Sequence, residues 1–308
     1  MFPLTSKELT NLKKNDFELL QKLDDNGCFA GVNESFAEFK SRLILEKREL
    51  DKFDKKITSG EATEIIDDIK VVKDDLIPLE IINEAGETTQ KFYDFRIDYL
   101  PGFFLNKDIG LLWGGCSIYD EKSGQRIFLI RKNFKNSHNW FIYDRNELLS
   151  HELCHGARQI LNDRKLEEFF AYQTSKSALR RYIGNCFISE ADALLFVLPP
   201  ILLLLAQLSQ IYIFPNLSIV PFWAFTIGMI IFFFLRNHLA RKIFFNASAK
   251  IEKFKIEKSS AFLFRCTSSE MAEIAKLNSR EEFLLWVNNK AKNELRFQII
   301  SRKWKLNE

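Results

Sequence analysis

The chain has 308 residues, 46% of them hydrophobic, and its 44 basic and 41 acidic residues leave a formal net charge of +3. This length suits one or two domains with a sizeable core. Because the charges are well mixed and form no basic tract, the composition excludes a nucleic-acid partner. The five cysteines are irregularly spaced and include no C-x-x-C, which excludes a disulfide framework and favours a reducing compartment.

The N-terminal region, residues 1–85, is predicted to be helical. Between Ser6 and Lys56, charged residues alternate with periodic Leu, Ile and Phe, which predicts two helices joined by a loop near Asn26–Gly27. A third helix is expected between Glu61 and Lys73. We expect a solvated helical pair packed on the main domain; a coiled-coil-like arm or a partner-binding cap is the alternative.

A second region, residues 86–190, is predicted to begin with a sheet. Its strand-like segments are rich in aromatic and aliphatic residues and are broken by glycine, proline and polar residues: Phe92–Ile97, Gly110–Tyr119 and Gln125–Arg131. The last two indicate a hairpin with its loop at Glu121–Gly124, and hence a small antiparallel sheet. An exposed edge strand of such a sheet can hold an extended peptide by main-chain hydrogen bonds.

The clearest helix signal of the soluble part covers Asp144–Leu161. Asp144 and Glu147 have the spacing of a capping box. At about 100° per residue, one stripe of this helix is apolar, while His151 and His155 project from roughly the opposite side. The apolar stripe consists of Leu149, Leu153, Ala157 and Ile160. One face of the helix can therefore pack on the sheet while the other holds polar chemistry.

His151, Glu152 and His155 form an H-E-x-x-H motif within this helix. At helical spacing the two imidazoles share a face and the glutamate sits beside them, which is the arrangement of a two-histidine zinc site with a general base. The alternative interpretation is a pair of structural histidines. Cys154 points away from both histidines and is interpreted as a small buried residue.

A zinc site of this kind needs a third protein ligand and a free position for water. No third histidine follows the motif closely. The next helix is predicted to begin near Lys165, after a tight turn at residues 162–164, and to run back antiparallel. It carries Glu167 and Glu168, and either acid would come towards the level of His155.

The motif together with Glu168 and Ala171 resembles the gluzincins, zinc metallopeptidases in which a glutamate on a following helix completes H-E-x-x-H, often with alanine three residues later. The resemblance covers about residues 147–173. Many gluzincins have an aspartate four residues after the ligand, where it supports a metal-bound histidine, but here Tyr172 stands at that position. Some membrane-integrated peptidases of this broad group also combine a cytoplasmic-facing H-E-x-x-H helix with transmembrane helices. The topology predicted here is similar to theirs only in this general respect.

What the resemblance implies is a zincin-like domain with one Zn²⁺ per chain. His151, His155 and Glu168 would be the metal ligands, with Glu167 as the second choice for the third ligand. Glu152 would be the general base for hydrolysis of peptide bonds by metal-activated water. Such sites commonly add a hydrogen-bond donor for the oxyanion. The candidates remain open and are Tyr172, Tyr182, Arg158 and His138.

A transmembrane hairpin is predicted within residues 191–236. Residues 193–214 and 217–235 are free of charged side chains and are joined by Pro215–Asn216. Each run has about 20 residues, enough to cross a hydrocarbon core of roughly 30 Å. A pair of buried core helices in a soluble protein is the alternative. Pro199–Pro200 predicts a kink in the first helix.

Basic residues flank this hairpin on both sides, whereas its turn carries no charge. They are Arg180, Arg181, Arg236, Arg241 and Lys242. Since positive residues favour the cytoplasmic side, both soluble parts are expected to face the cytoplasm.

The C-terminal region, residues 237–308, is predicted to be helical. A basic, periodically apolar segment from Arg236 to Lys258 is expected to leave the membrane as a helix along its surface. Two more helices are predicted at Ser268–Leu277 and Ser279–Lys303, the second opened by a Ser279/Glu282 capping box.

The sequence therefore predicts an α+β fold: a small antiparallel sheet, an H-E-x-x-H helix and a glutamate-bearing helix, with a two-helix transmembrane hairpin and helical terminal regions. The function it favours is a membrane-anchored zinc endopeptidase acting on peptides or proteins, including membrane-associated ones. The alternative is a non-catalytic membrane anchor or scaffold whose helical arms bind a partner and whose H-E-x-x-H motif is structural or degenerate.

Overall fold

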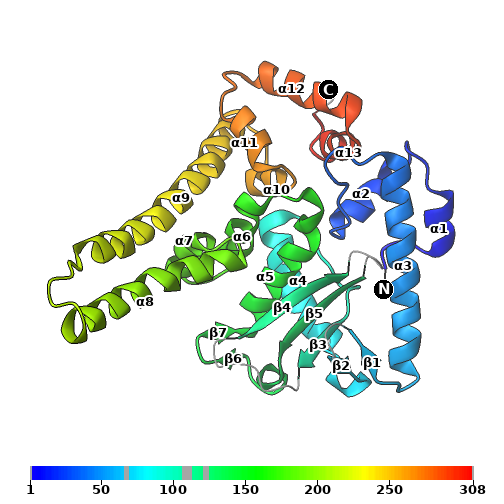
Figure 1. The fold of residues 1–308 in the computed structure, drawn as a ribbon. Coiled ribbons are helices and arrows are strands. Elements are labelled where there is room, and N and C mark those ends of the chain that lie inside the picture. Colours follow the sequence, from blue (N-terminus) through cyan, green and yellow to red (C-terminus); the bar gives the residue numbers. More distant parts are fainter. Residues whose placement is uncertain (1, 66–68, 106–112, 121–124, 307–308) are drawn as a thin grey trace.

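The computed structural model describes residues 2–65, 69–105, 113–120 and 125–306 (Figure 1). Within these ranges the protein is mostly helical and contains three small sheets. The helices are α1 Ser6–Asn11, α2 Phe17–Asp25, α3 Phe36–Thr58, α4 Leu79–Tyr93, α5 Arg145–Arg158, α6 Arg164–Gln173, α7 Ala178–Ile183, α8 Glu190–Tyr212, α9 Val220–Lys253, α10 Ser259–Phe264, α11 Ser268–Ile274, α12 Arg280–Asn293 and α13 Leu295–Lys303. The strands are β1 Thr63–Glu64, β2 Lys70–Val71, β3 Gly102–Leu105, β4 Gly115–Asp120, β5 Gln125–Arg131, β6 Asn139–Trp140 and β7 Tyr143–Asp144.

The central sheet has the order β3-β5-β4 and is mixed rather than antiparallel. β4 and β5 form the predicted antiparallel pair, whose loop at residues 121–124 lies outside the described ranges. β3 pairs with β5 in parallel. β4 thus runs opposite to both β3 and β5, and β5 rather than β4 lies beside β3. The predicted strand at Phe92–Ile97 does not form, because α4 runs to Tyr93.

The two faces of this sheet pack against different helices. Alternate side chains point to opposite faces of a strand. Phe104, Phe128 and Ile130 belong to the main core together with Leu149 and Leu153 of α5. The opposite face packs against α3 and β2 through Phe53, Ile57, Val71, Phe103, Ile127 and Leu129. The sheet thus fixes α5 in the interior.

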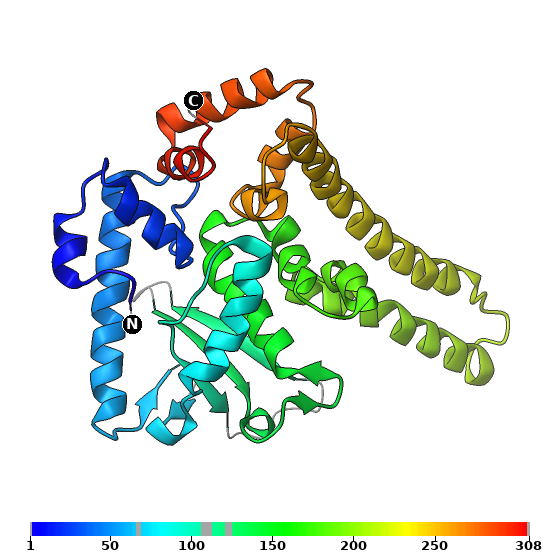
Figure 2. The ribbon, with the colours of Figure 1, turned by 180° about the vertical axis from the view of Figure 1, so that it is seen from behind.

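The helix expected at Glu61–Lys73 is not formed in its described part, where β1 and β2 pair antiparallel. A helix forms further along the chain instead. This is α4, which Figure 2 shows in front of the sheet. Its buried residues Ile82, Ala85 and Thr89 follow helical spacing and pack towards α5.

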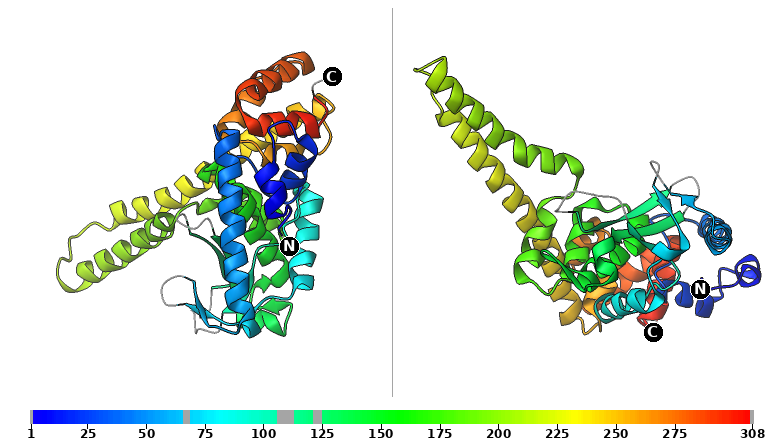
Figure 3. Two further views of the ribbon diagram at one scale, coloured as in Figure 1. Left: turned by 90° about the vertical axis from the view of Figure 1, so that its right-hand side faces the viewer. Right: turned by 90° about the horizontal axis from the view of Figure 1, so that it is seen from below.

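Helices α8 and α9 form a hairpin that projects from the body of the protein (Figures 1 and 3). Each is long and apolar enough to cross a membrane, and only 17% of its most apolar window is buried inside the protein. The alternative of buried core helices does not fit this exposure. Pro199 and Pro200 lie within α8.

Helix α9 is longer than predicted. It begins at Val220 and continues through Arg236 to Lys253, a length of 34 residues, or about 51 Å. The segment expected to turn along the membrane surface is therefore the continuation of the same helix. Ala247 and Ile251 bury that end in the main core.

The terminal regions pack together through this core, which includes residues from Phe2 to Leu306. The N-terminal region has three helices, α1 to α3, instead of two before residue 60. Ser279 caps α12 through a bond from the Glu282 backbone N–H, but the predicted capping box is incomplete, because the Glu282 carboxylate accepts from the Asn278 backbone N–H instead. The predicted helix to Lys303 is interrupted at Glu294, which separates α12 from α13.

Candidate metal centre

Helix α5 carries the H-E-x-x-H motif and begins at its predicted cap. The Asp144 carboxylate accepts a hydrogen bond from the Glu147 backbone N–H at 2.9 Å. The reciprocal bond of a capping box does not form; the Glu147 carboxylate instead accepts from Arg180 at 2.9 Å and from Ser175 and Lys176. These bonds tie the start of α5 to the segment after α6.

The turn between α5 and α6 is tight, as predicted. A short 3-10 segment, Gln159–Leu161, is followed by Asn162 in the left-handed conformation, and α6 begins at Arg164. Asparagine is one of the few residues that readily take this conformation. The chain thereby reverses, and α6 runs back along α5.

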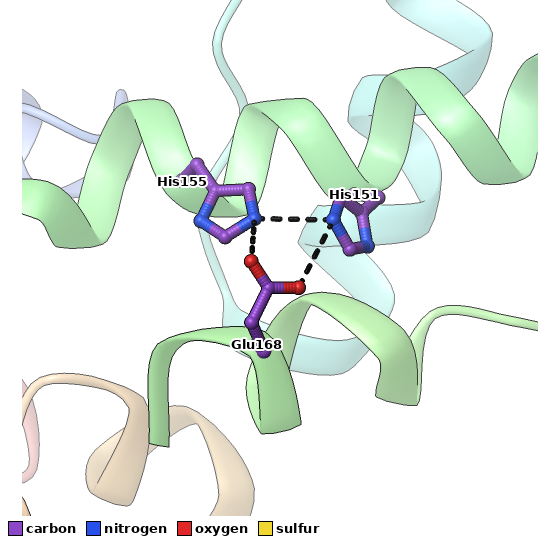
Figure 4. Close-up of side chains that lie close together, drawn as sticks. All are labelled: His151, His155 and Glu168. Carbon is purple, nitrogen blue, oxygen red and sulfur yellow. Dashed lines mark hydrogen bonds and ion pairs between the residues drawn. The ribbon is translucent and has the colours of Figure 1, made fainter. Parts of the chain in front are cut away.

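Three donor groups converge between the two helices (Figure 4). The Nε2 atoms of His151 and His155 lie 3.1 Å apart. One Glu168 oxygen lies 3.3 Å from His155 Nε2, and the other lies 3.6 Å from His151 Nε2. All three side chains are half-buried. The structure thus brings together the three residues predicted as metal ligands.

The spacing of these atoms fits a small tetrahedral ion. Histidine nitrogen and carboxylate oxygen bind zinc at roughly 2.0–2.2 Å, which places tetrahedral ligand atoms about 3.3–3.6 Å apart. The two nitrogens are 3.1 Å apart, and each lies 3.3 or 3.6 Å from a different Glu168 oxygen, so the separations are close to this edge length. Two imidazoles and one carboxylate are also a common donor set for catalytic zinc. The residues present therefore fit the metal that the motif implies.

Glu167 holds His155 from the opposite side of the ring. Its carboxylate lies 3.1 Å from His155 Nδ1, which leaves Nε2 facing the donor cluster. Burial by itself lowers the pKa of His155, but the hydrogen bonds with Glu167 and Glu168 outweigh burial and raise it well above the usual value. Glu167 thus contacts the ring nitrogen of His155 that faces away from the donor cluster, whereas Glu168 contacts the nitrogen that faces it.

His151 has an aromatic neighbour, Tyr172, which stands where many gluzincins have an aspartate. The Tyr172 ring meets the His151 ring edge-on, with centroids 4.5 Å apart. Burial, reinforced by the charge of Glu168, raises the pKa of Tyr172 to about 12, so its hydroxyl stays protonated. Burial and the charge of His155 lower the pKa of His151 well below its usual value. His151 is therefore neutral, as a metal ligand must be.

Gly184 determines the position of Tyr172. A Cβ atom at residue 184 would lie 2.1 Å from Cγ of the Tyr172 ring. Real contacts of this kind do not occur at such a distance, so any other residue at 184 would displace the ring. The sequence carried no signal for this long-range contact.

Glu152 lies beside the donor cluster and is 6% exposed. The backbone N–H and hydroxyl of Ser117, on edge strand β4, hydrogen-bond to its carboxylate. Burial, reinforced by the charge of Glu168, raises the pKa of Glu152 despite the opposing effects of His155 and Ser117. A carboxylate with a raised pKa next to a metal site has the character of a general base. Nothing in the sequence pointed to Ser117.

A cleft of about 700 Å³ opens onto this group. Its floor includes His151, Glu152 and Glu168, together with Tyr172. The walls come from the start of β4, from the β6–β7 hairpin and from the segment between α7 and α8, and they include Trp113, Gly114, Gly115, Ile142, Tyr143, Ile183, Gly184, Phe187, Ile188 and Ser189. The cleft therefore runs from the donor cluster towards the base of the hairpin helices.

The other candidate oxyanion donors lie outside the residues that line this cleft. Arg158 is buried, pairs with Asp163 and donates to the carbonyl oxygens of Phe264 and Cys266. His138 is exposed in a loop, with its Nδ1 3.2 Å from Arg145. Tyr182 stacks on Phe234 of α9. Tyr172 is the one predicted donor at the cleft, while Cys154 is buried in the core as expected.

No protein-family model matches the chain, and neither a curated protein nor a solved structure matches it. The gluzincins thus remain a resemblance in the motif residues alone.

Proposed function

We propose that this chain is a membrane-anchored, zinc-dependent endopeptidase. The observation that carries the proposal is the convergence of His151, His155 and Glu168, whose donor atoms lie within 4.8 Å of one another, next to buried Glu152. A bound zinc ion polarises a substrate carbonyl and acidifies water. The fold, the cleft and the two long apolar helices support this assignment.

In this proposal the chain's own residues have distinct tasks. Neutral His151 and His155 and the carboxylate of Glu168 hold one Zn²⁺, and Glu167 keeps Nε2 of His155 turned towards it. Glu152 accepts a proton from water in the cleft and delivers it to the leaving amine. The Tyr172 hydroxyl, at the cleft, donates a hydrogen bond to the substrate oxygen as negative charge develops.

The substrate in this proposal is an extended peptide or protein segment. β4 is an edge strand of the central sheet, and its first residue, Gly115, lines the cleft beside Trp113 and Gly114. An edge strand offers main-chain groups to an added strand. The cleft reaches the base of α8, which favours segments held near a lipid bilayer.

We further propose that both soluble parts face the cytoplasm. The residues between α8 and α9 carry no charge, whereas Arg180, Arg181, Arg241 and Lys242 lie at the other end of the hairpin. Arg236 contributes less, because it pairs with Asp192 at 2.8 Å.

The decisive experiment measures metal and hydrolysis on the same full-length protein. Purified wild type should contain about one zinc per chain by elemental mass spectrometry and lose it on His151→Ala, while His238→Ala on α9 serves as the control histidine. Glu152→Gln should keep zinc and fold but leave peptides of a proteome digest uncut. Metal-free wild type with a normal fold would sink the proposal, and so would a fully active Glu152→Gln protein.

One observation favours the non-catalytic alternative. His155 lies between Glu167 on Nδ1 and Glu168 on Nε2, so a protonated imidazole would be satisfied there without metal. In that case the protein is a membrane anchor whose H-E-x-x-H motif stabilises the α5–α6 pair, and zinc binding is absent.

A further inference from the structure

The level at which the two long helices leave the body is marked by one ion pair. Arg236 is the first charged residue after the apolar run of α9, and Asp192 lies in the first turn of α8. Their two hydrogen bonds measure 2.9 and 2.8 Å. Beyond this pair both helices are apolar and largely exposed. The pair therefore marks the boundary between water and hydrocarbon for helices that cross a bilayer.

Helix α7 is fixed at this same level by two bonds from α9, and the segment that follows α7 is fixed by a third. Asn237 Nδ2 donates to the Tyr182 carbonyl oxygen, and Arg241 donates to that of Arg181, each at 2.6 Å. Arg236 donates to the Cys186 carbonyl oxygen, also at 2.6 Å. The exposed face of α7 includes Leu179, which is 67% exposed. An apolar side chain thus faces outward at the boundary.

The opposite rim of the cleft is also apolar. Phe141 and Ile142 form the two-residue turn between β6 and β7, and they are 63% and 50% exposed. Ile142 lines the same cleft as Phe187, which precedes α8. The turn and the base of the hairpin helices therefore border the same cleft.

The backbone conformation of the turn does not explain why Phe141 and Ile142 are large and apolar. Two-residue hairpin turns favour Asn-Gly or Asp-Gly, because their backbone takes positive φ angles. Phe141 has φ of 51°, a conformation that bulky residues rarely adopt. A large apolar pair in a strained, exposed turn indicates a contact with an apolar partner.

We propose that the β6–β7 turn and α7 insert their apolar side chains into the surface of the lipid bilayer that α8 and α9 cross. The cleft between them then opens at the membrane surface. A bilayer is the favoured occupant because the exposed apolar side chains of α7 and Phe187 continue directly into those of α8. Tyr182, at the same level, is a residue type enriched at membrane interfaces. The proposal requires α8 and α9 to be membrane spans, but it requires neither zinc nor hydrolysis.

The test is lipid quenching of a fluorescent label at Phe141→Cys in the full-length protein, reconstituted in phosphatidylcholine vesicles. Four of the five native cysteines are buried, and Cys116→Ser removes the half-buried one. The quencher is a lipid spin-labelled near the headgroup end of its chains. Leu204→Cys in α8 is the membrane control; Leu285→Cys in α12 is the matched control, because Leu285 is 62% exposed.

We expect the label at residue 141 to reach at least about half of the quenching seen at residue 204, as for a side chain inserted at the interface. Residue 285 should show almost none. A label at Leu179→Cys provides a second position if the strained turn does not tolerate cysteine. Quenching at 141 and 179 no greater than at 285 overturns the proposal. A label at 141 that is shielded from aqueous iodide but not quenched by lipid also overturns it, since a protein surface then covers the turn.

Discussion

Replacing Glu167 with glutamine should weaken zinc binding without removing a ligand. The Glu167 carboxylate lies 3.1 Å from His155 Nδ1 and fixes both the orientation and the basicity of that ring. Loss of such a supporting acid weakens metal affinity by about 10–100-fold, or about 1.4–2.8 kcal/mol. Glu168→Gln should reduce affinity further, because it neutralises a carboxylate whose two oxygens each lie close to one of the histidines.

The deficit of Glu167→Gln should depend on pH. In the metal-free protein Glu167 raises the pKa of His155, so below that pKa a proton competes with zinc for the ring. Glutamine removes this effect and lowers the pKa, which lessens proton competition in the variant. The loss of zinc affinity should therefore be larger near about pH 8.5 than near about pH 6, because proton competition for the His155 ring weakens as pH rises.

The assay is competition for zinc against a chromophoric chelator at these two pH values. Glu87→Gln, an exposed acid on α4, serves as the control and should bind zinc like the wild type. Equal affinities for Glu167→Gln and wild type would refute the supporting role of Glu167. A larger loss for Glu167→Gln than for Glu168→Gln would transfer the role of third ligand to Glu167.

Three further outcomes follow from the geometry. Tyr172→Phe should lower kcat for peptide cleavage by about 10²–10³-fold at unchanged zinc content, and unchanged kcat would remove Tyr172 as the oxyanion donor. Gly184→Ala should reduce activity similarly, because its Cβ would displace the Tyr172 ring; a crystal structure of the variant with an unmoved ring would contradict this. Burial by itself raises the pKa of Asp24, but neighbouring cations, chiefly Arg265, outweigh burial and lower it. The resulting stability is present above the unfolded pKa of about 3.9 and is lost as pH falls through the lower folded value. Asp24→Asn should therefore destabilise the protein at neutral pH by about 3–5 kcal/mol in thermal unfolding, whereas Asp25→Asn, whose side chain is 44% exposed, should have a smaller effect.

The local features of the site were predictable because they depend on short-range periodicity. The cap at Asp144, the apolar stripe of α5 and the placement of His151 and His155 follow from helical spacing alone. A tight turn at Asn162 is enough to bring α6 back along α5. Glu168 of α6 thereby comes close to both imidazoles. Short sequence distances thus determined the donor group.

Features that depend on distant contacts were not predictable in the same way. α4 was missed because Gly86 and Thr89 are poor helix formers, although Thr89 is buried and donates to the Phe95 carbonyl oxygen at 2.9 Å. The parallel pairing of β3 follows from which strand lies beside β5, a choice that no local pattern encodes. The contacts of Ser117 with Glu152 and of Gly184 with Tyr172 likewise join separate elements.

The charges around α5 argue for a cation rather than a purely structural motif. A protonated His155 accounts for Glu167 and Glu168, but it leaves Glu152 buried beside them, with its pKa raised mainly by burial and further by the charge of Glu168. The nearby arginines are each held by another acid, Arg158 by Asp163 and Arg180 by Glu147. A structural motif gains nothing from a third carboxyl group in a half-buried cluster, since like charges destabilise one another. The divalent ion that we propose between the two imidazoles and Glu168 would offset that repulsion and would make the position of Glu152, in the lining of an open cleft, chemically useful.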